Sequence, residues 1–239
     1  MLLEQGIHDG VAMSDYLADP APEPSLSTGI VQALIERSPR HAWHAHPRLG
    51  KSGDEATSRG DLGSAVHAMV LGGQPVVYAP DEFGDWKKKD AQAFRDAARL
   101  DGKLPLLEWQ RLAVETMTRN VRAILARFGA GKTEQTMLWE QDGVWCRGRA
   151  DFLTDDLKYD IDLKTCANAD PTTWVKRTVM AGGLDIQAGL RSCGHEMITG
   201  CMRDMLWLLV EIEPPFGACV VGVGPSMLMG VFAGALAVL

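Results

Sequence analysis

Residues 147–165, RGRADFLTDDLKYDIDLKT, place aspartates and basic residues on two stretches whose apolar positions alternate as in β-strands. In the second stretch, alternation puts Asp162 and Lys164 on one face, with Asp160 at the rim. Asp151 belongs to the first stretch, and two adjacent strands can bring it close to them. Paired carboxylates repel unless a cation lies between them, and Mg²⁺ prefers such oxygen ligands. A lysine beside the ion can orient or deprotonate a water, which is the chemistry of phosphodiester hydrolysis.

A structural interpretation fits the same residues. An aspartate and a lysine two positions apart on a strand commonly form an exposed salt bridge that contributes little to stability. The spacing alone therefore leaves two interpretations open, a catalytic metal site or a solvated ion pair.

The elements that would position these residues change type along the chain. Up to about residue 130 the apolar positions mostly recur with the period of a helix. The period then changes to two, and turn signals at Asp142-Gly143 and Asp155-Asp156 separate three expected strands. A helical stretch over residues 170–193 and two further strands follow. We therefore expect a mixed α/β (α+β) domain.

Composition leaves several function classes open. The 239 residues carry a net charge of −7, which is unlike a passive nucleic-acid coat. An acidic outer surface can nevertheless coexist with a local basic groove. The five cysteines include no CxxC pair, and the N-terminal residues lack the features of a signal peptide. We therefore expect a cytoplasmic protein with free thiols.

Several motifs, taken in order, resemble one nuclease superfamily. GRADFL…IDLKT is similar to the PD-(D/E)xK core, and LGSAVHAMVLGG resembles the G-x-x-x-H-x-x-x-x-G helix of its RecB-like branch. GKTEQTMLWEQDGVWCRGRADFL resembles the corresponding run in exonuclease VIII (RecE-like) and phage PDDEXK-like exodeoxyribonucleases. GLDIQAGLR resembles the downstream Q-x-x-x-Y helix. The resemblance spans roughly residues 15–225, and the order and spacing of the motifs make it specific.

The resemblance implies a restriction-endonuclease-like core, in which helices flank a central mixed β-sheet and the N-terminal part is helical. We expect residues 1–26 to form an N-terminal extension and residues 27–239 to form one nuclease domain. Within that domain, residues 27–132 would be the helical part, and residues 133–239 would hold the catalytic sheet with its flanking helices.

The resemblance also implies roles for individual residues. Asp151 and Asp162 would bind Mg²⁺, or Mn²⁺ in its place, with the Leu163 carbonyl and His67 as further ligands. Lys164 would position the attacking water.

Three more positions complete the site that the resemblance implies. Glu134 would lie in the same cleft, at a second metal site or beside the first, and Gln187 would orient the site or the DNA. The usual tyrosine of Q-x-x-x-Y is Arg191 here, and an arginine can contact phosphate. Taken alone, His67, Glu134 and Gln187 would each have a structural interpretation. The residues expected to contact DNA are Arg147, Arg149, Lys176, Arg177 and Arg191.

Two further expectations concern cofactors and membranes. RecB-like nucleases with an iron–sulfur cluster carry a cysteine well upstream of the core, and none precedes Cys146, so we predict no cluster. Residues 217–239 carry no charge, but Gly224-Pro225 divides them. We expect a buried strand and a docking helix there rather than a membrane span.

The combined expectation is a Mg²⁺-dependent exodeoxyribonuclease, a hydrolase acting on ester bonds, encoded by a bacterium or a phage. It would degrade double-stranded DNA ends in the 5′ to 3′ direction during recombination. The resemblance implies a single-strand annealing protein or recombinase as partner and a ring-shaped homo-oligomer. Two alternatives remain, a nuclease of other specificity (single-strand or endonuclease) and a non-catalytic DNA-binding or assembly protein on a nuclease-like scaffold.

Overall fold

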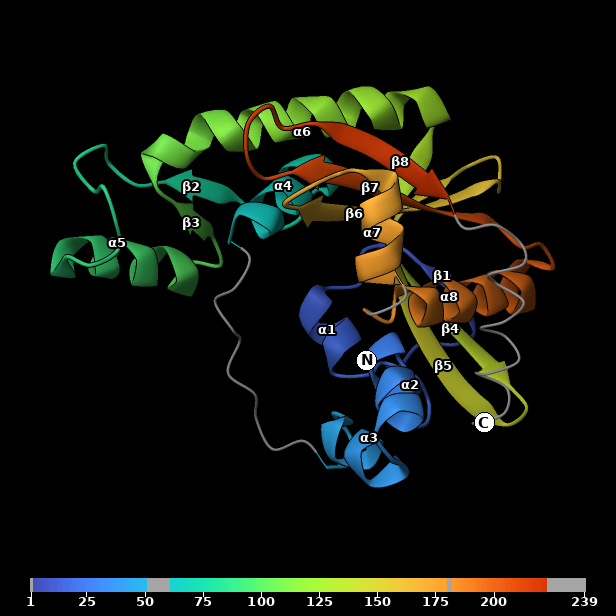
Figure 1. The fold of residues 1–239 in the computed structure, drawn as a ribbon. Coiled ribbons are helices and arrows are strands. Elements are labelled where there is room, and N and C mark those ends of the chain that lie inside the picture. The colour runs from blue at the N-terminus through green and yellow to red at the C-terminus, as the bar shows by residue number, and fades with distance from the viewer. Residues whose placement is uncertain (1, 51–60, 180–181, 223–239) are drawn as a thin grey trace.

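One six-stranded sheet organises the molecule (Figure 1). The computed structural model describes residues 2–50, 61–179 and 182–222. The strand order is β1-β4-β5-β6-β7-β8, in which β6 and β7 are parallel and the other neighbours are antiparallel. The strands of this sheet are β1 (Gly6–His8), β4 (Gly131–Gln141), β5 (Val144–Thr154), β6 (Tyr159–Cys166), β7 (Asp204–Glu211) and β8 (Ala218–Gly222).

Helices cover both faces of this sheet, as the predicted fold class requires. The helices are α1 (Met13–Leu17), α2 (Thr28–Glu36), α3 (Pro39–Ala45), α4 (Asp61–Leu71), α5 (Lys89–Leu100), α6 (Arg111–Leu125), α7 (Pro171–Trp174) and α8 (Leu184–Thr199). Apolar residues of α4 and α6 pack on β6 and β7 in one core cluster. Residues of α7 and α8 pack on the opposite face. The mixed sheet between helices confirms the expected α/β class.

The three strands predicted around the acidic segment are β4, β5 and β6. Asp142 and Gly143 join β4 to β5, and both have positive φ angles, 52° and 81°. This conformation suits the two-residue turns whose twist matches that of a hairpin, and Asp-Gly is a favoured sequence there. Asp155 and Asp156 lie in the turn between β5 and β6. Both predicted turns are therefore confirmed.

The N-terminal extension forms part of the sheet. Within residues 1–26, β1 pairs antiparallel with β4, and α1 follows it. The part expected to be helical, residues 27–132, also holds a small parallel sheet of β2 (Val76–Tyr78) and β3 (Leu104–Leu106). With α5, this small sheet projects from one end of the molecule (Figure 1).

The expected strand near the C-terminus is β8, which pairs antiparallel with β7. The helix expected after Gly224 lies outside the described residues. Within the described residues, no helix is both long enough and apolar enough to cross a membrane.

Candidate active site

Glu134 and Asp151 occupy opposing positions on β4 and β5. The neighbours of Glu134 on each side pair with the neighbours of Asp151, so the register continues through this point. The backbone of Glu134 is left-handed, with φ of 54°, a conformation that is uncommon for a residue other than glycine. Such backbone conformations cluster at functional sites. The kink therefore marks this end of β4 as a candidate site.

Asp151 also lies opposite Asp162 of β6, the strand that borders β5 on the side away from β4. The ladder between β5 and β6 contains two pairs, and the last joins Phe152 to Ile161. Asp151 and Asp162 are the next residues in this register, at the point where the two strands part. Together with Glu134, they form a row of carboxylates across three neighbouring strands.

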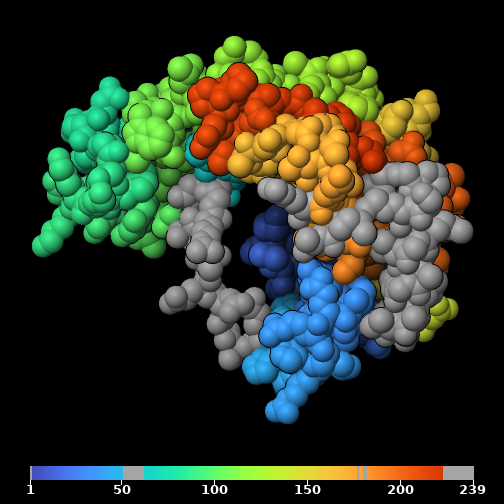
Figure 2. All heavy atoms as spheres, viewed as in Figure 1, coloured from blue at the N-terminus to red at the C-terminus, as the bar shows by residue number. Residues whose placement is uncertain are grey.

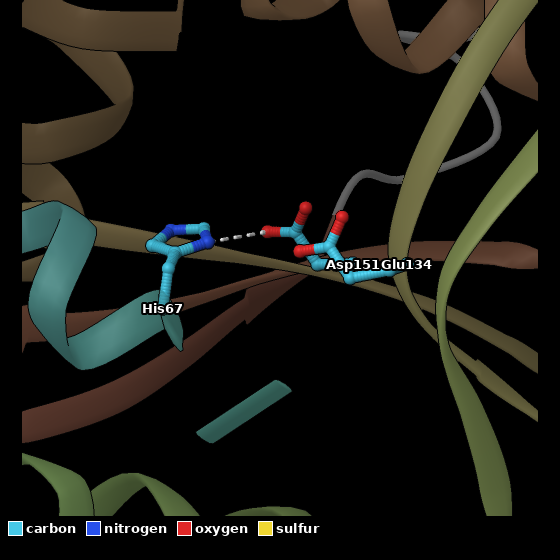
Figure 3. Close-up of side chains that lie close together, drawn as sticks. All are labelled: His67, Glu134 and Asp151. Atoms are coloured by element: carbon cyan, nitrogen blue, oxygen red, sulfur yellow. Dashed lines mark ion pairs between the residues drawn. The ribbon is translucent and has the colours of Figure 1, made fainter. Parts of the chain in front are cut away.

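His67 reaches this row from α4. Its Nε2 donates a hydrogen bond to the carbonyl oxygen of Leu163 at 2.8 Å, and its Nδ1 lies 3.8 Å from Asp151 Oδ2 (Figure 3). Gly63 allows this approach, because a Cβ atom at that position would lie 2.8 Å from Oγ1 of Thr165. The glycine of the G-x-x-x-H pattern is thus needed where α4 crosses β6.

His67 and two carboxylates of this row can hold one metal ion. One ligand atom from each of His67, Glu134 and Asp151 lies within 4.8 Å of the others, and Figure 3 shows the two carboxylates facing the imidazole. The predicted ligand set also named the Leu163 carbonyl and Asp162. The Leu163 carbonyl accepts a hydrogen bond from His67. Asp162 instead accepts hydrogen bonds from Gln187 and Arg191 of α8.

The charge of this row affects Asp151 directly. Burial, and after it the charge of Asp162, raises the pKa of Asp151 to about 6. The Asp151 carboxylate also accepts a 2.7 Å hydrogen bond from the backbone N–H of Leu163. A buried carboxylate whose ionisation is made more costly by a neighbouring carboxylate is typical of a site that binds a cation.

Asp162 is held by three side chains. Its Oδ1 accepts hydrogen bonds from Arg191 Nη1 at 2.7 Å and from Gln187 Nε2 at 3.3 Å. Its Oδ2 lies 2.5 Å from Lys164 Nζ in an ion pair. The structure therefore brings Lys164, Asp162 and Gln187 together, as the resemblance implied.

The polar face of α8 continues into a buried network. Gln187, Arg191 and His195 follow one another at intervals of four residues, so they share one face of the helix. Arg191 donates to both carboxylate oxygens of Asp160, and His195 Nε2 lies 2.9 Å from Asp160 Oδ2. Burial opposes ionisation of Asp160, but the charge of Arg191 and the hydrogen bond with His195 outweigh it, so the pKa of Asp160 lies below its ordinary value.

The residues expected to contact DNA lie in different settings. Arg147 is buried, where its Nη1 donates to the carbonyl oxygen and hydroxyl of Ser25 and lies 3.3 Å from Asp19 Oδ1. Arg191 is buried in the network of α8. These two predictions are corrected, because both guanidinium groups are committed to interior partners. Their strand and helix patterns showed the face each residue occupies but not what covers that face.

Of the other three basic residues, the structure describes the surroundings of Arg149 and Lys176. Arg149 lines the cleft and binds Glu134 Oε2 through Nε at 2.6 Å. Lys176 is exposed in the π-helical segment Val175–Val179 that follows α7, and Arg177 is the next residue in the chain.

A cleft of about 840 Å³ gives access to the row of carboxylates. Its walls include His67, Glu134 and Lys164, the end of α4, and the N-terminal residues 9–13. In Figure 2 the N-terminal segment is visible in dark blue, deep in a hollow of the surface. Sequence reasoning assigned no role to residues 9–13, which show no motif.

His195 was also missed, and Asp160 was expected only at the rim. The spacing of Gln187, Arg191 and His195 on one helical face was a signal for this network. The second signal was Asp160 itself, an acidic residue on a strand whose apolar residues predict burial.

Comparison with known proteins agrees with this geometry. Residues 34–229 match the family described as "PDDEXK-like domain of unknown function" (DUF3799). A search of curated proteins found no match.

Solved structures are similar to this chain at low sequence identity. An exonuclease candidate from Eubacterium rectale has 15% identity and a TM-score of 0.66, and the match covers 95% of this chain and 83% of that one. An alkaline exonuclease from Laribacter hongkongensis has 14% identity and a TM-score of 0.34, over 73% and 84% of the two chains. A phage-related exonuclease from Haemophilus somnus has 14% identity and a TM-score of 0.32, over 72% and 89%.

The first of these likenesses supports the fold, and the other two have TM-scores too low to carry an argument. The family match covers well over half of the chain, and it agrees with the mixed sheet and the row of carboxylates. The chain therefore belongs to the PDDEXK-like family DUF3799, within the PD-(D/E)xK nuclease superfamily.

Proposed function

We propose that this protein is a metal-dependent deoxyribonuclease that hydrolyses phosphodiester bonds in DNA. One observation carries the proposal. The ion pair of Lys164 and Asp162 lies beside the group of His67, Glu134 and Asp151, at one cleft of a PDDEXK-like sheet. A site that binds a hard cation next to a fixed ammonium is suited to phosphoryl chemistry.

The side chains present fit a divalent ion. A carbonyl oxygen can only accept, so the hydrogen bond from His67 to Leu163 requires a proton on Nε2. In the neutral ring, Nδ1 then presents a lone pair to Asp151 Oδ2 at 3.8 Å. Two groups that both present lone pairs repel unless a cation or a proton lies between them. One imidazole and two carboxylates suit Mg²⁺ or Mn²⁺.

His67, Glu134 and Asp151 would hold this ion, which would supply positive charge to a phosphoryl oxygen. Lys164 has the second role. Its side chain is 32% exposed and lines the cleft, while Asp162 fixes its ammonium from the interior. An ammonium held in this way can donate a hydrogen bond to the attacking water and orient it towards the phosphorus.

The substrate proposal is double-stranded DNA ends, degraded in the 5′ to 3′ direction during recombination of a bacterial or phage genome. The resemblance to RecE-like nucleases and the fold shared with an exonuclease candidate support it. A single-strand annealing protein or recombinase would use the product. A cytoplasmic ring of identical chains is the assembly that the resemblance implies.

A digestion assay tests this function. The purified chain is incubated with end-labelled linear duplex, and separately with closed circular DNA, in the presence of Mg²⁺ or of a chelator. We expect Mg²⁺-dependent shortening of the linear duplex from its 5′ ends, an intact circle, and no product from Asp162→Ala. Absence of a metal-dependent product, or equal product from the variant, would contradict the nuclease proposal.

Two other outcomes identify the alternatives. Cutting of the closed circle would show an endonuclease. Binding of DNA without cleavage under any metal would favour a non-catalytic assembly protein.

A further inference from the structure

Both oxygens of Asp162 are already engaged by cations. Arg191 Nη1 lies 2.7 Å from Oδ1, which also accepts from Gln187, and Lys164 Nζ lies 2.5 Å from Oδ2. The residue is 2% exposed, so this carboxylate has little contact with solvent. An ion that approached Oδ1 would meet the guanidinium, and an ion that approached Oδ2 would have to displace the ammonium.

Arg191 cannot move aside. It is 1% exposed, its Nε donates to Asp160 Oδ2 at 2.9 Å, and its Nη2 donates to Asp160 Oδ1. Withdrawal of the guanidinium would leave two buried carboxylates with reduced charge compensation, which is strongly unfavourable. Where the resembling helix has a neutral tyrosine, this chain therefore has a permanent cation.

The other two carboxylates of the row are less constrained. Glu134 uses Oε2 to bind Arg149, and Asp151 uses Oδ2 to accept from the Leu163 N–H. Among the described residues, no hydrogen bond reaches Glu134 Oε1 or Asp151 Oδ1. Each residue thus keeps one oxygen without a hydrogen bond, and each offers a ligand atom within 4.8 Å of one from His67.

Charge repulsion separates the two ends of the row. A divalent ion on Asp162 would lie close to both Lys164 and Arg191, and like charges a few ångströms apart repel strongly when water is largely excluded. Asp162 is better suited to hold the Lys164 ammonium than to bind metal.

We propose that Arg191 acts as a built-in cation that keeps Asp162 out of the metal's ligand set, so that each chain binds a single divalent ion through His67, Glu134 and Asp151. Asp162 is then a positioning residue that holds Lys164. This inference rests on the proposed metal-dependent function.

Titration of the chain of 239 residues with Mn²⁺, by calorimetry and by electron paramagnetic resonance, measures ion binding without any catalytic reaction. We expect one ion per chain. Asp151→Asn should weaken binding by at least about tenfold because it removes a ligand, whereas Asp162→Asn should keep the affinity within about threefold. DNA cleavage should be lost in both variants, because Asp151→Asn removes a metal ligand and Asp162→Asn releases Lys164.

Two results of this titration would overturn the inference. One is two ions bound to the wild-type chain. The other is a loss of affinity in Asp162→Asn as large as that in Asp151→Asn, with both variants folded by circular dichroism.

A charge-neutral pair of substitutions tests the role of Arg191 itself. Asp160→Asn with Arg191→Gln removes one anion and one cation and keeps polar side chains of similar size. We expect Asp162 to become available, so that a second Mn²⁺ binds or the affinity rises by about tenfold. The matched control is Asp19→Asn with Arg147→Gln, another buried pair, which should bind one ion with wild-type affinity.

Unchanged binding in the first double variant, or the same change in both, would contradict the role of Arg191. If the first double variant does not fold, the Mn²⁺ affinity of Asp162→Asn decides whether Asp162 is a metal ligand. Failure of the proposed function is distinguishable, since a chain that binds one Mn²⁺ and cleaves no DNA would contradict the nuclease alone. A chain that cleaves DNA with two bound ions would contradict the single-ion site alone.

Discussion

Gly63 of α4 lies so close to Thr165 of β6 that a Cβ atom on the glycine would come within 2.8 Å of the threonine Oγ1. This contact sets the distance at which α4 presents His67 to the sheet. Gly63→Ala should therefore displace His67 and weaken Mn²⁺ binding by about tenfold. Adding Thr165→Ala removes the obstructing atoms and should restore the affinity. Calorimetric titration measures both, and a double variant as weak as the single one would show that this contact does not position His67.

The ammonium of Lys164 should matter for the chemical step and not for ion binding. Lys164→Met keeps the aliphatic stem but removes the hydrogen-bond donor, so we expect DNA cleavage to fall by about 10³-fold. Mn²⁺ affinity should not fall, because Lys164 is no ligand. Lys132→Met, an exposed lysine outside the cleft, is the control and should cleave at the wild-type rate. Loss of ion binding in Lys164→Met would contradict this division of roles.

Alanine usually makes a strand more stable than glycine does. At Glu134 we expect the reverse, because the backbone there is left-handed. Both Glu134→Ala and Glu134→Gly lose the contact to Arg149 and one metal ligand. At φ of 54° alanine is strained and glycine is not, so the glycine variant should be more stable by about 1 kcal/mol. Urea denaturation measures the difference. Equal stabilities, or a more stable alanine variant, would mean that this conformation costs nothing.

Ion binding should depend on pH through Asp151. Burial and the charge of Asp162 raise its pKa to about 6, so protons compete with the metal below that pH. The affinity for Mn²⁺ should be constant above about pH 7 and should fall by at least about tenfold for each pH unit below 6. In Asp162→Asn the charge contribution disappears, so the onset of the fall should move to lower pH. Calorimetry from pH 5 to 8 measures the onset, and the same onset in both proteins would contradict this cause.

The buried pair of Arg191 and Asp160 should dominate the effect of charge on stability. Arg191→Met leaves Asp160 and Asp162 with reduced compensation, and we expect a loss of about 3–5 kcal/mol in the free energy of unfolding. The comparison is Lys158→Met, which breaks a 3.3 Å pair with Asp156 at the surface. That change should cost less than about 1 kcal/mol. Similar losses in the two variants would show that burial does not decide the cost.

Local patterns were sufficient to predict the sheet around the acidic segment. Period-two alternation and the Asp-Gly turn identify β4 and β5, because a hairpin is specified by residues that are neighbours in the chain. The same alternation placed Asp162 and Lys164 on one face of β6, where the structure has them in contact.

Contacts between distant segments could not be predicted in this way. Arg147 was expected to meet DNA because its strand face was known, but Asp19 and Ser25 of the N-terminal extension cover that face. The network of Arg191, Asp160 and His195 depends on how α8 lies across β6, which no local pattern specifies. Such packing is decided by burial of a whole helix face. The resemblance implied the contacts of a tyrosine at position 191, whereas the arginine present there contacts Asp160 and Asp162.

The early separation of β5 and β6 has a consequence for the evolution of the site. In a continued ladder, the N–H and C=O of Leu163 would bond to β5. Here the N–H donates to Asp151 and the C=O accepts from His67, so the backbone of a single residue aligns two site residues from different elements. This alignment is independent of the side chain at position 163, and among the natural residues only proline would remove the donor. Substitutions among apolar residues there can adjust the core without disturbing the geometry of the metal site.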